Sequence, residues 1–141
     1  MAERKYQITL MDSHTVDGET EQNSSTLFGK LGYHAGKYII EYDEQDGDFS
    51  GCKTRVHVTE PDCVTVCRTG VTTTELTMEK NVRHVCQYDT PYGTMMLGIY
   101  ATDVRSDMST FGGTLSLSYE IDGNGELISQ NQLQIIVKEI F

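Results

Sequence analysis

The chain of 141 residues has no tryptophan, only 2 prolines, and few basic side chains, with 11 Lys and Arg against 21 Asp and Glu. A formal net charge of −10 argues against nucleic-acid binding and against docking on an anionic membrane, since both need clustered positive charge. No apolar run approaches the ~18 residues of a membrane helix. No apolar stretch follows the first charged residues, so we expect no signal peptide and a cytoplasmic location.

Signatures of metal sites and nucleophiles are also missing from the sequence. The cysteines contain no C-x-x-C pair, the four histidines have no metal-ligand spacing, and there is no Gly-x-Ser-x-Gly or phosphate-binding loop. Without export, the thiols should stay reduced. We therefore predict no catalytic residue, no metal site and no cofactor, and an enzyme is less favoured than a binding protein.

Two segments imitate calcium sites without meeting their requirements. Asp122, Asn124 and Gly125 would fit three positions of an EF-hand loop, but Asn131 replaces the closing glutamate and the flanks alternate like strands. Residues 43–48 form an acidic run that is typical of a solvated loop. Neither segment predicts a bound cation.

The dominant positive signal is alternation of apolar and polar residues, which predicts half-buried β-strands. The alternating segments are residues 6–10, 37–42, 55–59, 64–66, 76–78, 84–88, 95–99, 115–121 and 133–137. We interpret the polar segment 12–25 as a loop with a possible strand edge. Strands spaced by about 8–12 residues are typical of an antiparallel sandwich or barrel.

Turn residues between these segments favour the barrel over the sandwich. Asp17-Gly18, Asp46-Gly47, Gly112-Gly113 and Asp122-Gly123 tolerate positive φ and predict tight hairpins. Consecutive hairpins give an up-and-down meander, and its closure removes the exposed edges. The sequence thus predicts one all-β domain over residues 1–141, an antiparallel up-and-down barrel of about 8–10 strands. Bends in such a barrel would use the interior glycines Gly29, Gly32 and Gly98.

Two longer segments resemble a known family. Residues 88–100 (YDTPYGTMMLGIY) and 117–129 (LSYEIDGNGELIS) are similar to signature segments of the YwiB-like family of bacterial proteins. The resemblance implies a calycin-like barrel, related in shape to lipocalins and fatty-acid-binding proteins, in a cytoplasmic protein without an established function. It supplies no catalytic residues. The chain departs from the family in the more acidic connection 43–54, and it lacks the Gly-x-Trp motif of lipocalins.

Two functions follow from this fold. The first is a small-molecule carrier or sensor that holds a small hydrophobic or amphipathic ligand in the barrel, because tyrosines in strands combine apolar area with a hydroxyl group. The candidate ligand-binding residues form a strip that is expected to face the interior of the barrel, and they are Tyr42, His84, Tyr88, Tyr100 and Tyr119.

The alternative is a packed barrel that acts through its outer surface as a protein-interaction or regulatory module without a ligand. In that case large side chains would fill the lumen, and the candidates are Met78, Met95, Met96, Phe49 and Phe111. A strand left unpaired by incomplete closure would allow a homodimer, but the sequence leaves the oligomeric state open.

Overall fold

The computed structural model describes residues 5–44, 51–60, 62–70, 73–90 and 93–140, which form ten β-strands. These are β1 (Tyr6–Val16), β2 (Glu19–His34), β3 (Lys37–Asp43), β4 (Lys53–Glu60), β5 (Cys63–Thr69), β6 (Thr74–Glu79), β7 (Arg83–Thr90), β8 (Gly93–Ser109), β9 (Gly112–Gly123) and β10 (Glu126–Glu139). Each strand pairs with the next one, and β1 also pairs antiparallel with β10, so the barrel closes. The predicted all-β, up-and-down barrel is confirmed. A search of the described ranges for membrane-spanning helices found none.

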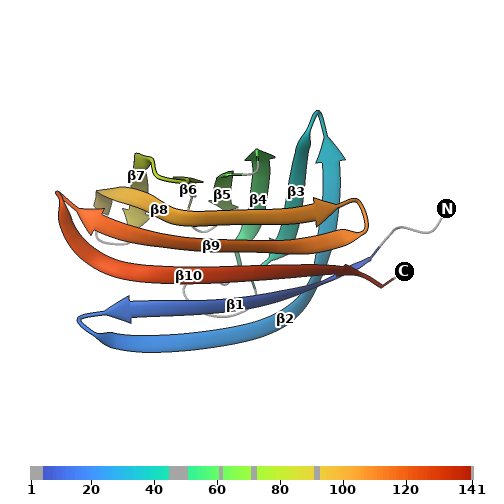
Figure 1. Cartoon of the computed structure of the whole chain (residues 1–141), viewed down its shortest axis with the longest axis horizontal. Helices are drawn as coiled ribbons and strands as arrows, with labels where there is room; N and C mark the ends of the chain where they lie inside the picture. Colours follow the sequence, from blue (N-terminus) through green and yellow to red (C-terminus); the bar gives the residue numbers. More distant parts are fainter. Residues whose placement is uncertain (1–4, 45–50, 61, 71–72, 91–92, 141) are drawn as a thin grey trace.

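The barrel is built from two layers. Figure 1 shows the long strands β1, β2 and β8–β10 lying across the shorter strands β3–β7. Within the first layer, strands that are distant in sequence become neighbours because the barrel closes between β1 and β10. The outer face of this layer therefore combines side chains from both ends of the chain.

Apolar side chains fill the interior between the two layers. Met95 is exposed although it alternates with Leu97 and Ile99, but the other residues predicted to point inward do so. Most of the buried side chains form one core cluster. The exposed fraction is 0% for seven of them, Ile8, Ile40, Val64, Ile99, Ala101, Leu115 and Ile135. Because a water-sized space beside a side chain would leave it some accessible surface, no such space touches these residues. The interior around them is packed rather than hollow.

The prediction of a loop over residues 12–25 is wrong. Apart from the turn at Asp17-Gly18, these residues belong to β1 and β2, which pair continuously from Tyr6 with Gly29 to Val16 with Glu19. The pairing supplies backbone hydrogen bonds whatever the side chains are, so a polar segment makes strands as long as both neighbours are present. The turn was predicted correctly, since Asp17 and Gly18 have φ values of 51° and 80°.

Other local predictions shift by a few residues. The last hairpin turns at Asn124-Gly125 and not at Asp122-Gly123, and Gly112-Gly113 begins β9 instead of forming a turn. Asp46-Gly47 and Phe49 lie outside the described residues. Of the remaining candidates for filling the lumen, Met78 is buried, whereas Met95, Met96 and Phe111 are exposed.

Candidate functional site

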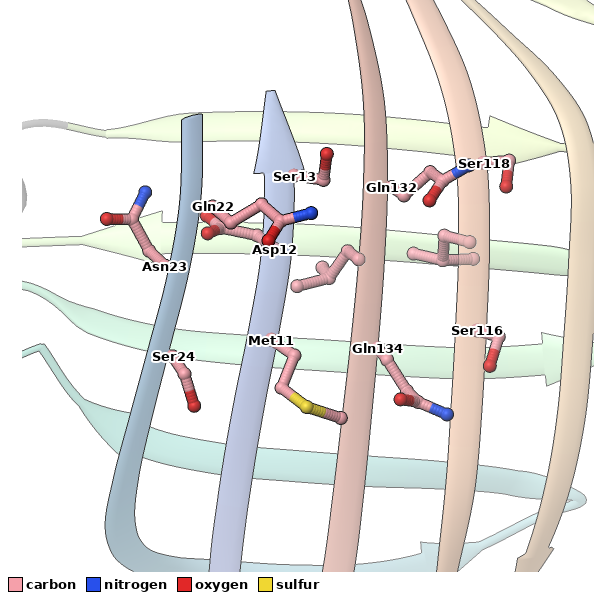
Figure 2. A pocket seen from close by; sticks show the side chains of 12 residues that line it. Met11, Asp12, Ser13, Gln22, Asn23, Ser24, Ser116, Ser118, Gln132 and Gln134 are labelled. Atoms are coloured by element: carbon pink, nitrogen blue, oxygen red, sulfur yellow. The ribbon is translucent and has the colours of Figure 1, made fainter. Parts of the chain in front are cut away.

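Two rows of side chains cross four neighbouring strands on the outer face of the long layer. They alternate with inward residues such as Leu117, so they point away from the core. The strand register places Gln22, Ser13, Gln132 and Ser118 in one row, and Ser24, Met11, Gln134 and Ser116 in the next. Figure 2 shows both rows across β2, β1, β10 and β9.

A cavity of about 540 Å³ lies over these two rows. We call it the outer groove. Its lining consists of Met11, Asp12, Ser13, Gln22, Asn23, Ser24, Ser116, Leu117, Ser118, Gln132, Leu133 and Gln134. The short serine side chains leave space above the sheet, while the longer Gln and Met side chains rise beside it. The volume lies within the range of ordinary small-molecule sites.

A second hollow of about 350 Å³ continues the groove toward the Asp17-Gly18 turn. It adds a third row in the same register, made of Thr20, Thr15, Gln130 and Glu120. The amide of Gln130 donates a hydrogen bond to Oε2 of Glu120 at 3.4 Å. The three rows that line the outer groove and its extension therefore form a regular array of hydroxyl and amide groups with very few charges.

The groups of this array are suited to hydrogen bonding with a ligand. Amides and hydroxyls donate and accept hydrogen bonds, but neither ionises near neutral pH. The lining of the groove and its extension contains two carboxylates, Asp12 and Glu120, and no His, Cys, Lys or Arg. Among the residues that the structure describes, no group of three or more His, Cys, Asp or Glu side chains could hold a metal ion.

The tyrosine strip predicted from the sequence is only partly assembled. Tyr42 is buried in the core, and Tyr88 and Tyr119 are packed against it. His84 pairs in register with the buried Ile99, and its Nε2 lies 3.0 Å from Oε1 of Glu79. These four residues share the inner face of the barrel.

Tyr100 is a correction to the predicted strip. Its neighbours Ile99 and Ala101 have an exposed fraction of 0%, so the alternation of β8 turns Tyr100 to the outer face. There its hydroxyl group donates to Oδ1 of Asn81 at 3.4 Å. The prediction that Tyr100 faces the barrel is wrong.

The inner face also carries a polar row that connects two of these tyrosines. Tyr42, Thr54, Arg68, Thr74 and Tyr88 are successive register partners across β3–β7. We call them the inner row. The Oγ1 atom of Thr74 is buried and has no hydrogen-bond partner among the described atoms.

The inner row includes one side of an ion pair between Arg68 and Glu44. Nε of Arg68 lies 3.6 Å from Oε1 of Glu44, and Thr54 donates a 2.8 Å hydrogen bond to that same oxygen. Burial, followed by the negative charge of Glu44, raises the pKa of the Tyr42 phenol well above its ordinary value. Burial likewise raises the pKa of the Tyr119 phenol, while the charge of Arg68 opposes this shift.

These pKa shifts predict how the native protein titrates at alkaline pH. Both phenols should stay protonated while the protein is folded and ionise once it unfolds. The free energy of unfolding should therefore fall as the pH rises above the ordinary phenol pKa, because the unfolded state releases these two protons and the native state does not.

The measurement is tyrosinate absorbance against pH for the parent chain and the double variant Tyr42→Phe and Tyr119→Phe. We expect the same native-state curve for both proteins and a smaller absorbance step on alkaline unfolding for the variant. A smaller native-state amplitude in the variant would show that the phenols titrate in the folded barrel.

Comparison with known proteins places the chain in a family. The family model described as "Domain of unknown function (DUF1934)" matches residues 8–135. The chain belongs to the DUF1934 family. No curated protein matches the sequence.

A solved structure of similar fold comes from Bacillus subtilis. It is the crystal structure of the ywiB protein, which is 19% identical in sequence and has a TM-score of 0.86. The similarity covers 98% of this chain and 93% of the ywiB chain. At this level of identity the similarity concerns the fold, and it agrees with the barrel expected for a YwiB-like protein.

The two sequence segments on which the resemblance was based meet in this DUF1934 barrel. β8 and β9 place Gly98 beside Asp122, and the Arg83 guanidinium group binds the two oxygens of Asp122 at 3.0 and 2.6 Å. A Cβ atom on Gly98 would fall 2.3 Å from Nη2 of Arg83, so glycine makes room for this ion pair. The hydrogen bond from Arg83 lowers the pKa of Asp122.

The groove and the inner row were not predicted from the sequence. For some of their residues, however, the alternation along the strand indicates the face to which the side chain points. Arg68 follows Val64 and Val66 at the same spacing, so alternation alone places a cation on the inner face. Ser116 and Ser118 likewise alternate with inward leucines. Nothing in the sequence indicates that these serines lie beside residues of β1 and β2, because that contact exists only in the closed barrel.

Proposed function

We propose that this DUF1934 protein is a binding module that acts through the outer groove and performs no catalysis. The observation that supports the proposal is a contrast between its two faces. Core side chains with an exposed fraction of 0% pack the interior around them, whereas the outer face has a cavity of about 540 Å³. A ligand can enter the groove without displacing the core.

The composition of the groove favours a small molecule over a protein partner. Protein interfaces are enriched in aromatic, Met and Arg side chains, and serine is depleted in them. Here four serines line the cavity, Ser13, Ser24, Ser116 and Ser118, and Met11 is the main apolar side chain that points into it. In addition, the described strands pair with a neighbour along most of their length, except at the narrow contact between β6 and β7, so little backbone edge is open to a partner strand.

The carrier function, with a ligand in the barrel, is the second candidate. It is supported by the inner row, where Arg68 supplies a cation and the buried hydroxyl group of Thr74 has no hydrogen-bond partner in the described part of the chain. The nearby contact between β6 and β7 is narrow, with Thr74 and Tyr88 as the pair in register and a bridge from Glu79 to Val82. A ligand that separates these two strands would reach the inner row.

We propose that either kind of binding takes place in the cytoplasm, in keeping with four cysteines that are thiols.

Amide chemical-shift mapping tests which face binds. We would record NMR spectra of the full chain while adding a mixture of small neutral, anionic and apolar fragments. The largest shifts are expected at Ser116, Ser118, Gln132 and Gln134. Shifts confined to Arg68 and its neighbours in the inner row would support the carrier instead.

Two variants make the mapping decisive. Ser116→Leu fills the groove from its floor and should remove the shifts there, without affecting the core. Thr74→Val changes the inner row by a nearly isosteric replacement and should leave groove binding unaltered. Fragment binding that survives Ser116→Leu, or an absence of any shift in the groove, would refute the proposed function.

A further inference from the structure

The charge of the groove restricts what it can bind. The chain has a net charge of −10, yet the two rows that point into the groove carry no ionisable side chain. An anion would lose hydration there without gaining an opposite charge, and it would also be repelled by Asp12 in the lining and by the rest of the molecule. A neutral ligand avoids both costs.

The hydrogen-bonding groups restrict the ligand further. Three amides, from Gln22, Gln132 and Gln134, and four serine hydroxyl groups come from four adjacent strands. An apolar ligand would cover these groups and leave them unsatisfied, which costs free energy. A ligand with many hydroxyl groups can satisfy them, because hydroxyl, amide and serine groups all donate and accept hydrogen bonds.

The spacing of the array suits a ligand with repeated hydroxyl groups. Neighbouring strands lie about 4.8 Å apart, and side chains two residues apart on one face are separated by about 6.7 Å. The two rows therefore present hydrogen-bonding groups at regular intervals across β2, β1, β10 and β9. Within the second row, the thioether of Met11 offers an apolar surface to the C–H face of a sugar ring.

We infer that the outer groove binds a short, uncharged sugar chain. This inference rests on the proposed function of the groove and specifies its ligand class. Since the residues of the groove supply no exposed aromatic ring for a sugar to stack on, binding is expected to be weak, with a dissociation constant on the order of 1 mM.

The experiment titrates the full chain with cellobiose and with maltose, and compares glucose with glucuronate as a neutral and anionic pair. Amide shifts in NMR spectra report both the site and the affinity. We expect saturable shifts at Ser116, Ser118 and Gln132 with a disaccharide, and none with glucuronate.

Variants test whether the amides make the contacts. Replacing Gln132 and Gln134 together by Leu should weaken disaccharide binding by at least about tenfold, since two hydrogen bonds are lost. Gln7→Leu is the matched control, because Gln7 also alternates outward on β1 but lies outside the lining. Gln134→Glu keeps the size of the side chain and should also weaken binding, which guards against a folding defect in the double variant.

The outcomes separate this inference from the proposed function. Fragments that bind in the groove while both disaccharides do not would overturn the ligand class and leave the groove as the binding site. Binding of glucuronate as tight as that of glucose would overturn the argument from charge. No shift in the groove with any probe would refute the ligand class and the groove together.

Discussion

Replacing Leu117 by Asp should lower the free energy of unfolding by at least about 3 kcal/mol, because it buries a carboxylate without a partner in the core. The side chain of Leu117 has an exposed fraction of 2%, and Leu115 on the same face is fully buried. Ser118 is its neighbour in β9 and points into the outer groove. Ser118→Asp should therefore cost less than about 1 kcal/mol, part of which is repulsion by Asp103 opposite it.

Denaturant unfolding of the two variants measures this difference directly. Both introduce the same side chain at adjacent positions of one strand, so they differ only in the face that receives the charge. Equal midpoints would show that the assignment of faces in β9 is wrong, and with it the position of the groove.

Replacing Gly29 by Ala is expected to destabilise the barrel by about 2–3 kcal/mol through steric overlap. A Cβ atom at this position would fall 2.3 Å from the backbone oxygen of Glu41 and 2.5 Å from Cδ1 of Ile8. The backbone oxygen cannot move without disturbing the pairing of β2 with β3.

Gly32 provides the control because it lies in the same strand with nothing within 4 Å of its Cβ position. Gly32→Ala should leave the stability unchanged or raise it by up to about 1 kcal/mol, since alanine restricts the unfolded chain. Thermal unfolding of both variants gives the comparison. A loss of stability with Gly32→Ala as large as that with Gly29→Ala would contradict the close packing of β2 at Gly29.

The barrel itself was predictable because the alternation of apolar and polar residues within each strand indicates which face of that strand is buried. Alternation in segments such as 115–121 and 133–137 depends only on neighbouring residues, and it gave the strand type and the inward side chains. The same rule already placed Tyr100 with Met96 and Gly98 on the outer face. Tyr100 was nevertheless predicted to belong to the barrel-facing strip because a tyrosine combines apolar area with a hydroxyl group. That prediction disregarded the position of Tyr100 in the strand.

The long β1–β2 hairpin and the groove could not be predicted in this way. Residues 12–25 have polar side chains on both faces, so their strands have no apolar alternation to reveal them. The groove depends on register partners such as Ser13 and Gln132, which are far apart in sequence. Each polar side chain resembles an ordinary solvent-exposed residue until its neighbours are known.

Closure between β1 and β10 has a consequence for how the molecule folds. Tyr6 pairs with Glu139, and Figure 1 shows the start of β1 and the end of β10 side by side. Within the barrel, β1 is synthesised before all the other strands and must wait for β10, and contacts of such long range slow folding. Until then, β1 presents an unsatisfied backbone edge, so the nascent chain is most vulnerable to aggregation just before the ring is complete.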